Sequence, residues 1–291
     1  MSSFLEKISC IIVAGGIDDG CKVSSTVEVI SKDFGNKKLP DIPQIIDGPS
    51  VLFQDGAVLL VGGLRNDNKC LQLNHGTWRE HSTLNKERYC HSVATTESGI
   101  FLFGGATDSY EYLPKGSTTW LMGKTEIPKG LWYGCAIAVK SDQEIWLIGG
   151  IGTNKRILSF NVKEHTFQEL PFQLNVGRRG HRCAFIPNTN KVMITGGYDD
   201  YTLDSTEIID TQDGSVTKGS RMNIERQFHG MGVLTINDED RLAVFGGHDR
   251  NSWIDSVELY NSNTEKWETS HIKLTQPNFH FGFLTVKLSD I

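Results

Sequence analysis

Six short apolar segments, each ending in a pair of glycines, recur along the chain at nearly constant spacing. They occupy residues 11–16, 58–63, 100–105, 145–150, 192–197 and 242–247. An apolar run of four or five residues that is rich in Val, Ile and Phe is typical of a strand buried on both faces. The paired glycines permit positive φ and let neighbouring backbones approach closely. The period of 42 to 50 residues predicts one structural unit repeated six times.

Further strands are predicted on both sides of each apolar run. A second strand follows each glycine pair, for example at residues 25–30, 205–210 and 256–260. A turn then leads to a strand that carries one large apolar side chain, which is Trp78, Trp120, Phe167 or Trp267. We expect these side chains to pack between adjacent sheets, where each buries about 150–250 Å², rather than to contact a ligand.

Four short strands in each of six repeats predict an all-β fold, a six-bladed β-propeller of four-stranded antiparallel blades. The first Gly-Gly pair lies at residues 15–16, too early for a full inner strand to precede it. Residues 277–286 resemble an inner strand that no Gly-Gly run follows. We therefore predict that this C-terminal strand completes the first blade, so that no sheet edge stays open between the first and last blades. Residues 1–291 are predicted to form a single domain.

An Arg-x-x-His motif opens the strand before several of the glycine pairs. It occurs at residues 88–91, 178–181 and 226–229, whereas residues 47–50 and 131–134 depart from it, and the fifth repeat lacks the tryptophan. In this motif, in the Gly-Gly strand and in the later Glu, Tyr and Trp positions, the chain resembles the kelch-repeat family over essentially its whole length. The departures affect local packing and leave the predicted ring unchanged.

Charge and cysteine usage narrow the function and the compartment. The net charge is −6 and the pI about 5.9, which argues against nucleic-acid binding because such binding needs a basic surface. The six cysteines are widely spaced without a C-x-x-C pair, so we expect free thiols in a reducing compartment. The N-terminus has no signal-peptide pattern, and the apolar runs are too short to span a bilayer. These features predict a cytoplasmic protein without membrane contact.

Antiparallel order within each blade places two sets of loops on one face of the ring. If the strands are called a to d from the axis outward, the b–c loops and the d–a connections share a face. Seven of the 11 arginines fall in these loops. Arginine and aromatic side chains are enriched at binding hot spots. The candidate partner-binding residues are Arg65, Asn66, Arg88, Tyr89, Trp132, Tyr133, Arg156, Arg178, Arg179, Tyr201, Arg226, Phe228, His248, Arg250 and Phe279.

We expect this face to form a shallow bowl that binds an acidic peptide or protein segment, because guanidinium groups bind carboxylates with two parallel hydrogen bonds. For Arg88, Arg178 and Arg226 a structural role is an equal alternative. Their repeated position predicts contacts with Glu or with backbone carbonyls that tie adjacent blades together. The aspartates between the arginines offer a second alternative, a bowl without net positive charge.

The resemblance implies a protein-interaction module, with substrate recognition in a ubiquitin ligase complex as the first expectation. It also leaves open an actin-associated role, in which a blade edge or a long loop would bind. A third alternative is an enzyme such as a sugar epimerase, because that class also uses a kelch ring. We expect the chain alone to be a monomer.

No catalytic, metal or cofactor site is predicted. The chain lacks Gly-x-Ser-x-Gly and the phosphate-binding Gly-x4-Gly-Lys-Ser/Thr. Residues 89–91, Tyr-Cys-His, resemble part of a copper-oxidase cluster, but alternate strand residues face opposite ways, so we expect core packing. Four histidines recur at what looks like one repeat position, and we expect each to be hydrogen-bonded within its own blade. They are His91, His181, His229 and His280.

Overall fold

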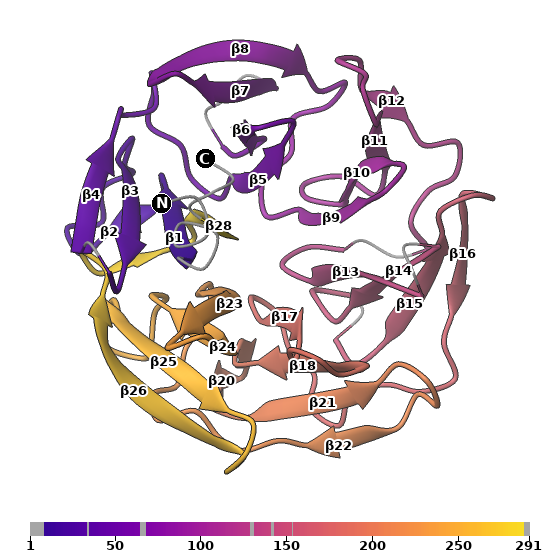
Figure 1. Cartoon of the computed structure of the whole chain (residues 1–291). Coiled ribbons are helices and arrows are strands. Elements are labelled where there is room, and N and C mark those ends of the chain that lie inside the picture. Colours follow the sequence, from indigo (N-terminus) through magenta and orange to yellow (C-terminus); the bar gives the residue numbers. More distant parts are fainter. Residues whose placement is uncertain are drawn as a thin grey trace.

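Six four-stranded antiparallel sheets stand around a common axis in the computed structural model (Figure 1). The structure describes residues 9–33, 35–64, 68–128, 131–140, 143–152 and 154–287. Every regular element among them is a β-strand. The prediction of an all-β, six-bladed propeller is therefore confirmed.

The blades follow one another in chain order. Blade 1 consists of β28 (Gly282–Lys287), β1 (Ser9–Ala14), β3 (Val27–Ser31) and β4 (Gly35–Leu39); blade 2 of β5 (Ser50–Gln54), β6 (Ala57–Val61), β7 (Lys69–Asn74) and β8 (Thr77–Thr83); and blade 3 of β9 (Ser92–Thr96), β10 (Gly99–Phe103), β11 (Tyr110–Pro114) and β12 (Leu121–Met122). Blade 4 consists of β13 (Cys135–Val139), β14 (Glu144–Ile148), β15 (Ile157–Asn161) and β16 (Thr166–Glu169); blade 5 of β17 (Arg182–Phe185), β18 (Lys191–Thr195), β21 (Thr206–Asp210) and β22 (Val216–Lys218); and blade 6 of β23 (Gly230–Ile236), β24 (Glu239–Phe245), β25 (Ser256–Asn261) and β26 (Lys266–Lys273). Two short pairs complete the set, β2 (Ile17–Asp18) with β27 (Asn278–Phe279) and β19 (Tyr198–Asp199) with β20 (Tyr201–Thr202).

Strands from the two ends of the chain close the ring. β28 pairs with β1 in antiparallel register, from Ser9 opposite Lys287 to Ala14 opposite Gly282. In Figure 1 the yellow C-terminal strand lies beside the indigo N-terminal one. The predicted closure is confirmed, and it leaves no inner strand missing from blade 1.

Each Gly-Gly pair fastens its blade to the next one. The second glycine donates its N–H to a backbone carbonyl at the start of the following blade, at distances of 2.7 to 3.3 Å. These six hydrogen bonds run from Gly16 to Ile46, Gly63 to Arg88, Gly105 to Leu131, Gly150 to Arg178, Gly197 to Arg226 and Gly247 to Asn278. The bonds form a complete circle, because the last one returns from blade 6 to blade 1.

The first glycine of the pair makes room for that carbonyl. A Cβ atom on Gly62 would lie 2.6 Å from the carbonyl oxygen of Arg88, and one on Gly196 would lie 2.3 Å from that of Arg226. Both glycines have positive φ, +64° and +58°. Any side chain here would therefore meet both backbone strain and a collision.

The large apolar residues of the outer strands pack between blades, as predicted. The indole N–H of Trp120 donates to Ser82 Oγ of the preceding blade at 3.0 Å, and that of Trp267 donates to the Ser220 carbonyl at 3.2 Å. Trp78 donates to the Pro40 carbonyl at 2.8 Å. Phe167 is half-buried and packs against Phe103 of blade 3.

Three buried arginines hold the entering connections of blades 3, 5 and 6. Arg88, Arg178 and Arg226 are almost completely inaccessible. Their guanidinium groups pair with Glu111, Glu207 and Glu258 at 2.9, 2.9 and 2.7 Å. Each also donates to the carbonyl of the first glycine in its own blade, as Arg226 does to Gly246 at 2.9 Å.

The prediction that Arg88, Arg178 and Arg226 contact a partner is therefore wrong, and the structural alternative holds. The backbone carbonyl of each binds the preceding blade while its side chain binds the blade that it enters. Blades 2 and 4 have Ile46 and Leu131 at this position, which explains why their sequences depart from the motif.

Replacing Arg226 with leucine should lower the free energy of unfolding by about 3–5 kcal/mol, because the Glu258 carboxylate then stays buried without its partner. The double variant Arg226→Leu/Glu258→Leu should recover only part of that loss, because Glu258 also accepts hydrogen bonds from the backbone N–H groups of Asn223 and Ile224 at 2.7 and 3.2 Å, and the apolar pair leaves these donors without an acceptor. Urea denaturation measures both effects.

The matched control is Arg221→Leu, which removes a guanidinium that is 73% exposed and paired with Asp204. Its effect should stay below about 1 kcal/mol. Equal losses for the buried and the exposed arginine would contradict the structural role of Arg226.

Candidate functional site

One face of the ring carries both the b–c loops and the d–a connections. Isolated bridges join the two loop sets, with Trp132 opposite Ile151, Arg179 opposite Tyr198 and Gln227 opposite His248. The short pair of β2 and β27 does the same in blade 1. The predicted sharing of a face is confirmed, and we call this surface the loop face.

Six residues, one from each blade, surround the axis just below the loop face. They precede the inner strands by two positions, and all have positive φ, between +51° and +65°. We call them the axial ring: Gly48, Cys90, Tyr133, Gly180, Phe228 and His280.

Backbone hydrogen bonds run from member to member of the axial ring. Five of the six members donate their N–H to the carbonyl of the preceding member: Tyr133 to Cys90 at 3.1 Å, Gly180 to Tyr133 at 2.7 Å, Phe228 to Gly180 at 2.8 Å, His280 to Phe228 at 3.1 Å and Gly48 to His280 at 2.9 Å. The ring therefore fixes where its six side chains converge.

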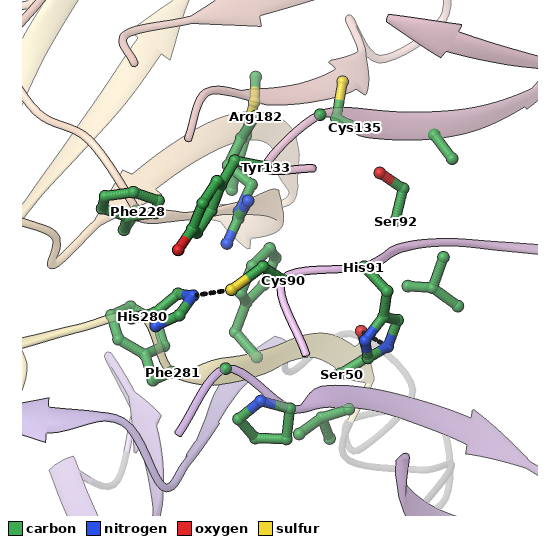
Figure 2. Close-up of a pocket in the computed structure, with 18 of the residues that line it drawn as sticks. Ser50, Cys90, His91, Ser92, Tyr133, Cys135, Arg182, Phe228, His280 and Phe281 are labelled. Carbon is green, nitrogen blue, oxygen red and sulfur yellow. Dashed lines mark hydrogen bonds between the residues drawn. The ribbon is translucent and has the colours of Figure 1, made fainter. Parts of the chain in front are cut away.

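Three large rings and two glycines share the axial ring, so that the rings pack into the centre. The rings of Tyr133, Phe228 and His280 pack together with centroid separations of 5.0 to 5.8 Å. The two glycines give them space, because a Cβ on Gly180 would lie 2.8 Å from Phe228 and one on Gly48 would lie 2.9 Å from His280. Figure 2 shows Tyr133, Phe228, His280 and Cys90 gathered in this way.

The axial ring contains backbone strain. Four of its members are not glycine yet adopt the left-handed conformation, which costs about 1–2 kcal/mol for each such residue. Clusters of this kind persist only where the surrounding structure enforces them, and they are typical of functional sites.

Asp47, His280 and Cys90 form a line of polar atoms within the ring. His280 Nε2 lies 3.2 Å from Cys90 Sγ, and its Nδ1 lies 2.6 Å from Asp47 Oδ1. The second contact is an ion pair rather than a well-aligned hydrogen bond. Burial alone would lower the pKa of His280, but Asp47 and Cys90 together raise it to about 9. The imidazole is therefore protonated at neutral pH.

Beneath the axial ring lies a cavity of about 280 Å³ that contains one arginine. At the strand position of Arg182 the other blades have Ser50, Ser92, Cys135, Gly230 and Gly282. The guanidinium of Arg182 stacks on Phe283 at 5.3 Å and donates to the His181 carbonyl at 3.2 Å. Its Nε has no hydrogen-bond acceptor. Burial lowers the pKa of Arg182 to about 10, so the group still carries its charge.

The repeat histidines are neutral packing residues. Burial and the neighbouring arginines lower the pKa of His91 and of His181 to about 3. His91 hydrogen-bonds to Ser50 Oγ and His229 to Thr195 Oγ1, both at 2.9 Å and both in the preceding blade. The expectation of bonding within one blade is therefore wrong for these two.

His280 does not share their position. Because Gly282 pairs with Ala14 before a glycine pair, His280 is equivalent to Cys90, and Phe281 takes the histidine position of blade 1. The grouping of His280 with the other three was wrong by one residue. Because of this shift by one residue, the imidazole of His280 points toward the axis.

The remaining predicted partner residues differ in accessibility. Arg65 and Asn66 lie outside the described residues. Arg179, Tyr201 and Arg250 are exposed, and Tyr201 keeps 54% of its surface accessible. The others are half-buried: Tyr89, Trp132, Tyr133, Arg156, Phe228, His248 and Phe279.

The exposed arginines lie on aromatic rings. Arg179 stacks over Tyr198 at 5.0 Å and Arg250 over Tyr201 at 5.6 Å. Arg250 also pairs with Glu225 at 2.9 Å. Two of the guanidinium nitrogens of Arg156, Nε and Nη2, donate to the carboxylate of Glu169. In the described part of the chain, no carboxylate lies within ion-pairing distance of Arg179. Of the predicted arginines that the structure describes, Arg179 is thus the one that is free to pair with a carboxylate of a binding partner.

Several residues of the site were missed in the sequence. Trp253 joins His248 and Phe279 in an aromatic cluster with centroid separations of 5.1 to 5.8 Å. A signal for Arg182 was present, since it stands where aligned repeats have serine, cysteine or glycine. The contact of Cys90 with His280 had no such signal, because 190 residues separate them.

Two cysteines that line the cavity are paired. Cys135 of β13 and Cys183 of β17 form a disulfide with a Cα–Cα distance of 6.2 Å. This corrects the expectation that all six cysteines are free. Cysteine usage therefore no longer indicates a reducing compartment.

Over the described ranges, no three His, Cys, Asp or Glu side chains are grouped so that they could hold a metal ion. Within the same part of the chain, no helix reaches the length and apolarity needed to cross a bilayer.

Gly180→Ala should lower the free energy of unfolding by more than Gly56→Ala does. Both positions have positive φ, +64° and +77°, so each loses about 1–2 kcal/mol. Only Gly180 faces a ring, and displacing Phe228 adds about 1–3 kcal/mol, whereas Gly56 has nothing within 4 Å. Thermal unfolding of the two variants gives the difference, and equal losses would show that the axial ring is not tightly packed.

Comparison with known proteins agrees with this geometry. A family model of the kelch motif matches residues 230–269, which run from the start of β23 into β26. A search of curated proteins gave no match. The matched segment is blade 6, and five further blades of the same four-stranded order stand in a ring with it. Blade 6 thus carries the kelch motif, and the chain as a whole is a six-bladed β-propeller.

Proposed function

We propose that this chain binds a protein partner through its loop face and that the bound segment is acidic. A kelch propeller is a general scaffold for protein interaction. The observation that carries the proposal is Arg179, which is exposed on the loop face and stacked on Tyr198. A guanidinium held on an aromatic ring is already oriented, so little freedom is lost when it binds a carboxylate.

The surroundings of Arg179 support the same conclusion. Tyr201 and Arg250 lie in neighbouring loops and are exposed, and Trp132 and Phe279 add half-buried aromatic surface. Tyr, Trp and Arg are the side chains that most often dominate binding energy at interfaces.

The aspartates of these loops cancel less of that charge than their number implies. Asp249 accepts hydrogen bonds from the backbone of Asn251 and Ser252 at 2.6 and 2.7 Å. Asp18 does the same for Gly20 and Lys22 at 2.9 and 3.0 Å. These two carboxylates are thus turned toward their own loops.

The ubiquitin-ligase role, the actin-associated role and the sugar-epimerase role stay predictions from the resemblance. They differ in the surface that they require. A substrate adaptor would use the loop face, whereas an actin-associated propeller would use a blade edge.

Charge reversal on the loop face should abolish binding of an acidic segment. The probe is an array of acidic peptides, each paired with a copy in which Asp and Glu are replaced by Asn and Gln. We expect Arg179→Glu to weaken binding of the acidic members at least tenfold, about 1.4 kcal/mol or more. Fluorescence anisotropy at two salt concentrations measures it, and binding should also weaken as salt rises.

Arg79→Glu is the matched control, because it makes the same charge change on β8, an outer strand at the blade edge. It should leave peptide binding unchanged. Loss of binding with Arg79→Glu but not with Arg179→Glu would move the interaction to a blade edge, and equal binding of acidic and neutral peptides would remove the acidic ligand.

A further inference from the structure

We propose that Cys90 is a nucleophilic thiolate, held by the imidazolium of His280, and that it is alkylated by small soft electrophiles that enter the axial cavity. Neither the kelch scaffold nor the binding proposal for the loop face requires this reactivity.

The proposal stands on the arrangement of three side chains from three blades. His280 Nε2 lies 3.2 Å from Cys90 Sγ, close enough for its N–H to hydrogen-bond to the sulfur. Asp47 lies 2.6 Å from the other ring nitrogen and therefore orients the imidazole and stabilises its protonated form. A cysteine activated by an adjacent imidazolium that a third group orients is a recurring pattern of covalent catalysis. Asp47 is the positioning residue of this set.

A second cation reinforces the arrangement. Arg182 lines the same cavity as Cys90. Burial lowers the pKa of Arg182, and electrostatic attraction to Cys90 opposes that lowering. In the described part of the chain, no carboxylate pairs with Arg182. Cysteines beside His⁺ or Arg react as thiolates, and Cys90 lies beside one of each.

The backbone conformation brings the two side chains together. Cys90 and His280 both hold the left-handed conformation, with φ of +57° and +58°. This conformation aims both side chains at the axis, where Tyr133 packs on His280. Strain of this kind accumulates at functional sites.

The cavity limits the reagent to a small molecule. Cys90 is only 7% exposed, but it borders the space of about 280 Å³. A reagent of a few heavy atoms fits such a space, since one water occupies about 30 Å³. A polymer-bearing reagent does not fit.

Alkylation by iodoacetamide illustrates the reaction. The Cys90 thiolate, paired with the imidazolium of His280, attacks the methylene carbon of the reagent. An S–C bond forms while the C–I bond breaks, and iodide leaves with the bonding electron pair. The imidazolium keeps its proton and stays paired with Asp47.

The other free cysteines provide internal comparisons. Cys10 and Cys70 are buried in the core, and burial raises their pKa to about 11 and about 12. Cys21 is exposed in a loop. Exposure alone would make Cys21 the most reactive thiol, whereas activation by His280 would make it Cys90.

The experiment measures the labelling rate of each cysteine in the native, unreduced chain at pH 7 with iodoacetamide and quantitative peptide mass spectrometry. We expect Cys90 to react at least about tenfold faster than Cys21, because an ordinary thiol is only a few per cent thiolate at pH 7. With a polymer-linked maleimide the order should reverse, because only Cys21 is accessible to a large reagent.

His280→Asn removes the imidazolium and suits the backbone, because asparagine is enriched at positive φ. It should slow labelling of Cys90 at least about tenfold, because an unassisted thiol is only a few per cent thiolate at pH 7, and leave the rate of Cys21 unchanged. Slow labelling of Cys10 and Cys70 shows that the variant is folded. If it is not, Asp47→Asn serves instead, and it should slow Cys90 while Cys21 again keeps its rate.

Two results would overturn the proposal. The first is a Cys90 rate in the natural chain that does not exceed that of Cys21. The second is a Cys90 rate that folded His280→Asn, or folded Asp47→Asn in its place, leaves unchanged.

Discussion

A single backbone hydrogen bond, repeated six times, holds the molecule together. The second glycine of each pair donates to a carbonyl of the next blade, and in five of the six pairs the first glycine leaves the space that this carbonyl fills. Both glycines are needed, because a Cβ on the first would collide with the acceptor. This hydrogen bond joins only two backbone groups, but it fixes the distance and the angle between adjacent blades. The interior packing of Trp78, Trp120 and Trp267 then fills the wedges that this spacing leaves.

The same bond sets the register of everything near the axis. Once the acceptor carbonyl is fixed, the residue two positions later falls in the axial ring. One position in each repeat therefore decides what occupies the centre of the propeller. In this chain that position holds two glycines, three rings and one thiol, so the centre is plugged on the loop-face side and hollow beneath.

The sequence was sufficient for the strands, the blade count, the closure and the packing role of the large apolar residues. Each of these follows from a local pattern that repeats. The direction of the repeat arginines could not be predicted, because a guanidinium in a connection satisfies either a buried carboxylate or a ligand. Arg88 became structural since Glu111 stands opposite it inside the blade. His280 was misplaced because no glycine pair follows it to set the register. The disulfide between Cys135 and Cys183 depends on which blades are neighbours and on the directions of the two side chains. The spacing of the cysteines in the sequence does not give those directions.

The pairing of β28 with β1 has a consequence for how the protein is made. Blade 1 needs a strand from each end of the chain, so during synthesis its first strand waits for the last one to leave the ribosome. All six residues of β1 are buried in the finished ring. Until β28 pairs with it, one edge of β1 has unpaired backbone groups that any extended chain can bind. Contacts of such long sequence separation also form slowly. Blades 2 to 6 are each continuous in the chain and could fold as they emerge, which leaves the completion of blade 1 as the last and slowest step.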